Sequence, residues 1–142
     1  APIEMVRCAD DELPPARKAI AYVDHFVDGS PTVIRIASHS AGTCDDPITP
    51  VCPNAADEIE IRMPSERLEA GVVLDLDDPT LEIVTNVQRA IGGAGECDFQ
   101  QTTAPRSGRL HVEVMDEDEL VVRLAATADG LLDGTYVAES CL

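Results

Sequence analysis

Aromatic side chains are scarce in this chain of 142 residues, which has two Tyr, two Phe and no Trp. Sugar-binding platforms and modules that stack nucleic-acid bases both depend on exposed aromatic rings. The composition therefore argues against carbohydrate binding and against base stacking. We expect a single hydrophobic core built mainly from Val, Ile, Leu and Ala.

Positive charge is scarce as well, because 10 Lys and Arg stand against 27 Asp and Glu, a formal net charge of −17. Such a surface repels phosphate backbones and anionic lipids. We expect no nucleic-acid partner. The charge itself has three readings: a solvated acidic coat, a cation site, or an interface for a basic protein.

Long apolar runs are missing, since no stretch reaches the roughly 18 apolar residues of a membrane span. The first residues, Ala1–Met5, are neither basic nor continuously apolar. We therefore expect no direct membrane insertion. An initial Ala in place of Met fits a mature exported protein and fits a trimmed chain equally well.

Catalytic motifs are missing too. Ser38 and His39 are adjacent, so on a strand they would point to opposite faces and could not form a nucleophile and base pair. No Gly-x-Ser-x-Gly elbow occurs, and the three histidines lack the i, i+4 spacing of a helical metal pair. The sequence predicts no catalytic residue and a protein that is not an enzyme.

Five cysteines are present, and none of them lies in a Cys-x-x-Cys pair. This spacing favours disulfides over a zinc or thioredoxin-like site, and with them an oxidising compartment: extracellular, cell surface or periplasm. The sequence does not determine the pairing. We prefer Cys44 with Cys52 and Cys97 with Cys141, which leaves Cys8 for an intermolecular bridge or a buried free thiol.

Acidic turns suggest one cofactor, calcium, because Asp-rich turns supply the oxygen ligands that Ca²⁺ prefers. We place the candidate site at Asp75, Asp77 and Asp78. No segment matches the twelve-residue EF-hand loop. Solvated turn charges are the alternative explanation.

The local patterns divide the chain into an extended N-terminal arm, residues 1–15, and a single domain, residues 16–142. Strand patterns cover 32–37, 58–63, 71–76, 109–115, 120–124 and 135–138, with a hairpin joining 109–115 to 120–124. Alternation at 58–63 indicates a strand with one solvent-exposed face. Residues 16–27 fit helix and strand equally, and residues 80–91 favour a strand.

A loop is predicted for residues 92–108, which are rich in Gly and polar side chains and carry Cys97. The remaining pattern predicts a mainly β fold: an antiparallel β-sandwich of about seven strands, stapled by disulfides, with room for one or two short helices.

Four features carry a resemblance: Cys44-Asp45-Asp46-Pro47, a strand ending at Pro64, the strand Gly71–Leu74, and the closing Asp133-Gly134-Thr135-Tyr136-x-Ala138-x-x-Cys141. Over residues 31–141 the chain resembles uncharacterised exported, cysteine-containing β-domains of predatory soil bacteria. The resemblance implies an exported β-domain and supplies no catalytic residues.

These observations lead to two functional hypotheses. The first is an exported structural or adhesive module of a cell-surface assembly, which self-associates or binds another exported protein, with the arm adding a strand to an open sheet edge. The alternative is an acidic module that binds calcium or a basic protein.

Overall fold

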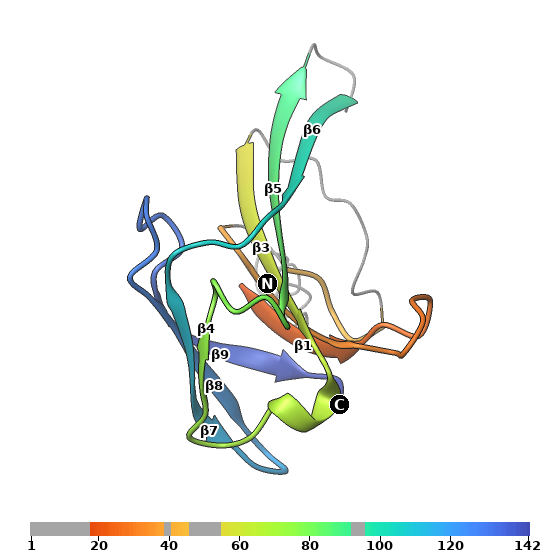
Figure 1. Ribbon diagram of the computed structural model, residues 1–142. Coiled ribbons are helices and arrows are strands. Elements are labelled where there is room, and N and C mark those ends of the chain that lie inside the picture. Colours follow the sequence, from red (N-terminus) through yellow and green to blue (C-terminus); the bar gives the residue numbers. More distant parts are fainter. Residues whose placement is uncertain (1–17, 39–40, 46–54, 92–95) are drawn as a thin grey trace, which may run out of the picture.

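The computed structural model describes residues 18–38, 41–45, 55–91 and 96–142 (Figure 1). These residues form β-strands and one short 3-10 turn, η1, at Ser65–Arg67. The strands are β1 (Ala19–Val23), β2 (Thr32–Ala37), β3 (Ala55–Met63), β4 (Val73–Asp75), β5 (Glu82–Ile91), β6 (Glu96–Thr103), β7 (Arg109–Met115), β8 (Leu120–Ala125) and β9 (Gly134–Ser140). The mainly β prediction is confirmed.

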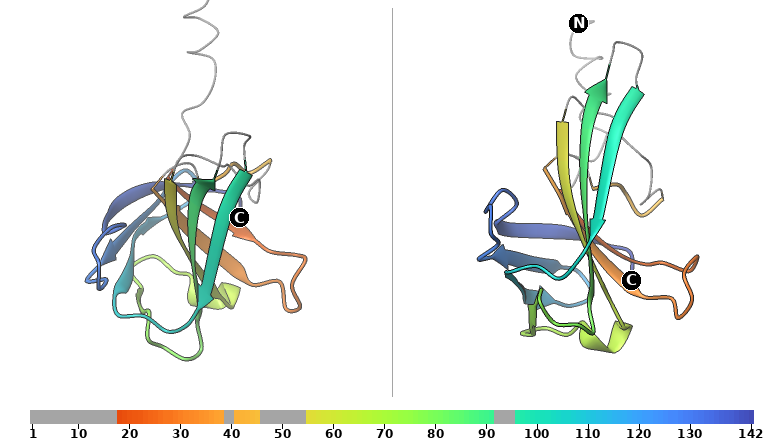
Figure 2. Two further views of the ribbon diagram at one scale, coloured as in Figure 1. Left: turned by 90° about the horizontal axis from the view of Figure 1, so that it is seen from above. Right: turned by 45° about the horizontal axis from the view of Figure 1, so that its top comes forward.

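All nine strands belong to one sheet, in the order β4-β7-β8-β9-β1-β2-β3-β5-β6. Neighbouring strands are antiparallel except β1 and β9, which are parallel, with Ile20 opposite Glu139. The sheet curls into a half-barrel, so that its two halves face each other (Figures 1 and 2). The strands thus form one curled mixed sheet of nine in place of a sandwich of about seven.

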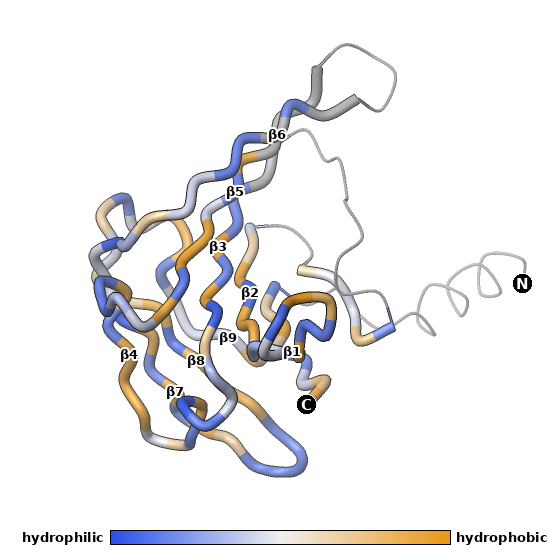
Figure 3. The backbone as a smooth tube through the Cα atoms, turned by 45° about the vertical axis from the view of Figure 1, so that its right-hand side comes forward, coloured by the Kyte–Doolittle hydropathy of each residue, from blue (hydrophilic) through white to orange (hydrophobic). Residues whose placement is uncertain are grey.

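The hydrophobic core fills the inside of this curl. It joins residues that alternate along β2, β3 and β5 to residues that alternate along β7 and β8, and it includes Ile34, Ile61, Ile83, Leu110 and Leu124. Alternating orange and blue along β3 and β7 in Figure 3 shows the period-two pattern that sends every second side chain inward. Hydrophobic burial between the halves therefore holds the curl closed.

The two ambiguous segments are both strands. Residues 16–27 contain β1, and residues 80–91 contain β5, which confirms the strand prediction for the second. The prediction of a loop over residues 92–108 is wrong for Glu96–Thr103, because these residues form β6 and pair with β5. The arm predicted for residues 1–15 lies outside the described residues.

The chain crosses from one half of the sheet to the other between β6 and β7. Arg106 N–H donates to the carbonyl of Leu76, and Leu76 N–H donates to the carbonyl of Gly108. Gly108 has φ +129°, and a Cβ there would lie 2.9 Å from Thr127 Cγ2. Only glycine fits this close approach of the crossing segment to the β8–β9 connection.

Candidate functional site: an open sheet edge and a cavity

The strand β6 forms one edge of the sheet. It pairs with β5 through eight successive residues, from Val84 opposite Thr103 to Ile91 opposite Glu96, without a register shift. No described strand pairs with its other side. Residue 98 and residues 100–103 are exposed. This edge therefore presents main-chain hydrogen-bonding groups that are free to pair with another chain.

The register determines which groups face outward. Ala104 N–H donates to the carbonyl of Ile83, and hydrogen-bonded pairs alternate with non-bonded pairs along an antiparallel ladder. Gln100 and Thr102 therefore direct their N–H and C=O groups toward β5. Gln101 and Thr103 direct theirs toward the open side.

The composition of β6 leaves the second half of this edge unprotected. Proteins commonly protect an edge strand with charged side chains, above all Lys, with Pro, with a bulge, or by making the strand very short. The sequence of β6, ECDFQQTT, has neither Lys nor Pro, its two acidic residues lie within its first three positions, and its register with β5 is unbroken. The opposite edge strand, β4, has only three residues, so the two edges differ in their capacity to accept a strand.

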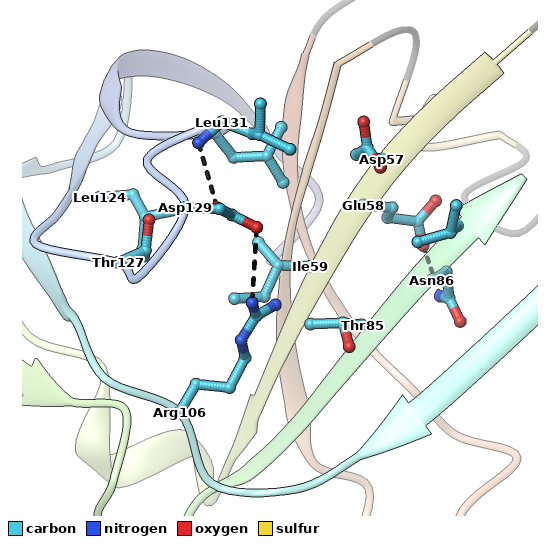
Figure 4. A pocket seen from close by; sticks show the side chains of 12 residues that line it. Asp57, Glu58, Ile59, Thr85, Asn86, Arg106, Leu124, Thr127, Asp129 and Leu131 are labelled. Carbon is cyan, nitrogen blue, oxygen red and sulfur yellow. Dashed lines mark hydrogen bonds and ion pairs between the residues drawn. The ribbon is translucent and has the colours of Figure 1, made fainter.

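A cavity of about 170 Å³ lies at one end of the half-barrel, between β3, β5 and the β8–β9 connection (Figure 4). Apolar side chains provide part of its lining: Ile59, Val87, Leu124, Leu131 and Leu132. Polar residues complete it: Asp57, Glu58, Thr85, Asn86, Arg106, Thr127 and Asp129. At 67 % exposure, Leu131 stands at its rim.

The β8–β9 connection that borders the cavity is held by its own aspartates. Asp129 Oδ1 accepts the Leu131 N–H at 3.1 Å, and Asp133 accepts the Thr127 hydroxyl. Arg106 reaches across to Asp129 at 3.6 Å (Figure 4). These contacts fix the wall that carries Leu131, so the cavity is preformed.

Charged side chains are buried on the outer face of β1, β2 and β3, opposite the core. Arg35 contacts Glu60 Oε1 at 2.8 Å and Glu58 Oε1 at 3.1 Å, and it donates to the Tyr22 hydroxyl at 2.8 Å. Arg62 contacts the other Glu60 oxygen at 2.9 Å. The face of 58–63 predicted to be exposed is therefore largely buried, with Glu60 5 % exposed.

The pKa values of the two glutamates in this network are shifted in opposite directions. Burial raises the pKa of Glu58, and its proximity to Glu60 adds to the rise. Burial also opposes ionisation of Glu60, but Arg35 and Arg62 outweigh it and lower the pKa of Glu60. Asn86 Nδ2 donates to Glu58 at 3.1 Å, while the buried Asn86 Oδ1 has no hydrogen-bond partner within the described structure. The charged groups of the network pair with one another, and Glu58 and Asn86 also belong to the residues that line the cavity.

The structure shows one disulfide among the described residues, between Cys44 and Cys141, with Cα atoms 5.3 Å apart. This corrects both preferred pairings, because Cys44 is not available to Cys52 and Cys141 is not available to Cys97. Cys8 and Cys52 lie outside the described residues. Cys141 packs against the outer-face cluster of Ile20, Tyr22, Val33, Ala37 and Ala41, so the bridge fastens the end of β9 over that face. A disulfide indicates a non-cytoplasmic location.

The three predicted calcium ligands are not gathered into one site. Asp78 accepts hydrogen bonds from Thr80, which with Arg67 lower its pKa to about 2. Asp75 is paired with Arg109 at 3.2 Å, and Asp77 is exposed. Within residues 18–38, 41–45, 55–91 and 96–142, no three His, Cys, Asp or Glu side chains are arranged to hold a metal ion.

Comparison with protein-family models, with curated proteins and with solved structures gives no match to this chain. The described residues include no helix long and apolar enough to cross a membrane. The edge at β6 and the cavity were both missed by sequence reasoning. Gln100-Gln101-Thr102-Thr103 has the β-forming threonines of a strand but no apolar alternation that would have signalled one.

Proposed function

We propose that this protein is a non-enzymatic structural module that acts outside the cytoplasm and assembles by accepting an extended strand at the open edge of β6. The observation that carries the proposal is the edge itself, which is eight residues long, unbroken in register and without charge in its second half. Main-chain groups at Gln101 and Thr103 are oriented for pairing. Strand addition of this kind requires no special side chains.

The donor of the added strand is the N-terminal segment of a second copy, residues 1–15. Pro14-Pro15 favours an extended chain at its end. Cys8 lies in this segment, and Cys97 lies in β6. A strand paired along β6 brings the two cysteines onto neighbouring chains, where an intermolecular disulfide would lock the assembly.

Two neighbouring glutamines provide the test, since their N–H groups point to opposite sides of β6. Gln101→Pro removes an outward N–H and leaves the ladder with β5 intact, whereas Gln100→Pro removes a ladder donor. We expect Gln101→Pro to weaken assembly with an unchanged melting temperature, because it removes strand addition alone. We expect Gln100→Pro to lower the melting temperature. The measurement is light scattering after size-exclusion chromatography across a concentration series.

Assembly that is as strong in folded Gln101→Pro as in the unmodified chain contradicts the proposal, and so does an unmodified chain that stays monomeric at every concentration. Non-reducing gels test whether a disulfide links the two copies. We expect a disulfide-linked dimer that disappears on reduction and in Cys8→Ser, and monomer under both conditions would rule out the lock.

A second candidate function is the acidic binding module, and one observation about the arginine side chains supports it. Six arginines of the described residues are each paired with a carboxylate: Arg35, Arg62, Arg67, Arg106, Arg109 and Arg123. Their positive charge is therefore used internally, and the acidic surplus is left to the surface. Binding of polylysine that weakens steeply with salt would support this function, because screening acts on charge contacts far more than on strand pairing.

A further inference from the structure

Phe26 is displayed at the tip of the β1–β2 hairpin with 93 % of its surface exposed, although only four aromatic residues of Phe, Tyr and Trp type occur in the whole chain. Val27 beside it is 41 % exposed. Covering a large apolar side chain in this position with another surface lowers the free energy of the system. The tip therefore presents an apolar surface that an apolar recess on another molecule could cover.

The backbone of the hairpin tip is held by hydrogen bonds from several positions. The Phe26 N–H donates to Asp24 Oδ1 at 3.1 Å, and the Asp24 N–H donates to the carbonyl of Pro31 at 2.9 Å. Arg62 fixes the other Asp24 oxygen at 3.2 Å. Gly29, with φ +83°, closes the turn. A tip whose backbone is already held in place loses little backbone freedom on docking.

The cavity beneath the β8–β9 connection has the size of an aromatic ring. Its volume is about 170 Å³, and an apolar protein cavity of about 150 Å³ is large enough to bind benzene. Ile59, Leu124 and Leu132 supply apolar wall, and Leu131 at the rim is exposed enough to be covered by an inserted side chain. The recess therefore has room for a phenyl ring, which would contact this apolar part of the wall while polar residues line the remainder.

Phe26 and the cavity lie on opposite sides of the molecule. In Figure 1 the orange β1–β2 hairpin projects to the right and the blue β8–β9 connection lies on the left, and Figure 2 shows the same separation. Phe26 therefore cannot reach the cavity of its own chain. We propose that Phe26 of one copy inserts into the cavity of a second copy, forming a head-to-tail contact.

This contact is heterologous, because it joins two different surfaces of the same protein, and it propagates unless rotation closes a ring. It is independent of the β6 edge, which uses main-chain groups of another strand. Each copy carries a net charge of −17, so salt screening is expected to strengthen the contact. That dependence is opposite to the one expected for a bound basic protein.

Two substitutions test the two halves of the contact, and both change exposed residues. Phe26→Ser removes the knob, and Leu131→Glu places a charge at the cavity rim. Val137→Ser and Val137→Glu are matched controls, because Val137 on β9 is also exposed, at 48 %. Sedimentation velocity at several salt concentrations measures association, in the unmodified chain and in the Gln101→Pro background that removes strand addition.

We expect Phe26→Ser and Leu131→Glu each to weaken association of the Gln101→Pro chain by about tenfold to a hundredfold. The Val137 controls should leave it unchanged. The decisive sample is an equal mixture of the two variants, since one keeps the cavity and the other keeps the knob. It should form a one-to-one dimer that does not grow with concentration.

Three results in the Gln101→Pro background would overturn the inference: association that Phe26→Ser leaves unchanged, an effect of Phe26→Ser with none from Leu131→Glu, or a mixture without the mixed dimer. Binding to phosphatidylcholine vesicles that depends on Phe26, with self-association unchanged, would also overturn it and assign the tip to lipid. If Gln101→Pro leaves assembly of the unmodified chain as strong as before, the β6 proposal alone is contradicted, so the two proposals can be tested separately.

Discussion

The two halves of the curled sheet use ion pairs on their outer faces in opposite ways. On the half formed by β1, β2 and β3, the side chains of Arg35 and Glu60 are 8 % and 6 % exposed. On the half formed by β4, β7 and β8, those of Arg109 and Asp75 are 61 % and 63 % exposed. The contacts are chemically alike, but only the buried ones leave an uncompensated charge when a partner is removed. The burial of an ion pair, more than the number of pairs, therefore determines how much stability is lost when one partner is removed.

The largest effect is expected for Glu60→Gln, which removes the carboxylate that Arg35 and Arg62 share and leaves each arginine with one remaining acidic partner. Removing one partner of a buried pair typically destabilises by about 3–5 kcal/mol. Urea denaturation followed by circular dichroism measures the loss. Glu113→Gln on the exposed half is the matched control. A loss below about 1 kcal/mol for Glu60→Gln would mean that the two halves do not differ.

Removal of the Cys44–Cys141 disulfide comes next, because it releases the segment that covers the outer face of β1 and β2. The bridge spans 97 positions. Loss of a native disulfide typically costs about 2–5 kcal/mol. The double substitution Cys44→Ser and Cys141→Ser should lower stability by this amount and increase hydrogen exchange in β1 and β2. Unchanged hydrogen exchange in β1 and β2 would show that the disulfide does not hold the covering segment in place.

The sequence predicted one kind of strand well and another kind poorly. The hairpin of Arg109–Met115 and Leu120–Ala125 was recognisable because each strand sends every second residue into the core. The strand β6 lies at the edge and is exposed along residues 100–103, so its sequence carries no alternation. Edge position is a property of the assembled sheet, and local sequence does not encode it.

Burial of charges and cysteine pairing were also beyond the sequence. The alternation at 58–63 correctly placed a strand, but the face carrying Glu60 was expected in solvent. Its burial depends on Arg35 from β2 and Tyr22 from β1, which only the register brings together. Cys44 and Cys141 meet because the parallel pairing of β9 with β1 carries the end of β9 to the β2–β3 connection.

A smaller, pH-dependent effect separates Glu58 from Glu60 within the buried network. Because burial raises the pKa of Glu58, the folded state binds this proton more tightly, and its contribution to stability is lost as pH rises from the ordinary carboxyl range through the raised pKa. Glu58→Gln should therefore raise the melting temperature at pH 7 by about 2–4 °C and flatten its pH dependence. Glu60→Gln should have the opposite sign at pH 7, and the same sign for both would contradict the assignment.

The smallest effect is expected on the exposed half. Arg123 and Glu113 are 2.8 Å apart, but their side chains are 41 % and 42 % exposed. Exposed pairs contribute about 0–1 kcal/mol. A double-mutant cycle with Arg123→Ala and Glu113→Ala should give a coupling energy in that range, falling with salt. A coupling above about 2 kcal/mol would show that this face is shielded.

The parallel pairing of β1 with β9 has a consequence for when the protein can fold. β1 finds β2 early during synthesis, but Ile20 has its other neighbour only when Glu139 is available. Pairings so distant in sequence close slowly, because the intervening chain must be ordered first. The strand β9 joins the two halves of the sheet, so the half-barrel is complete only after β9 has been synthesised.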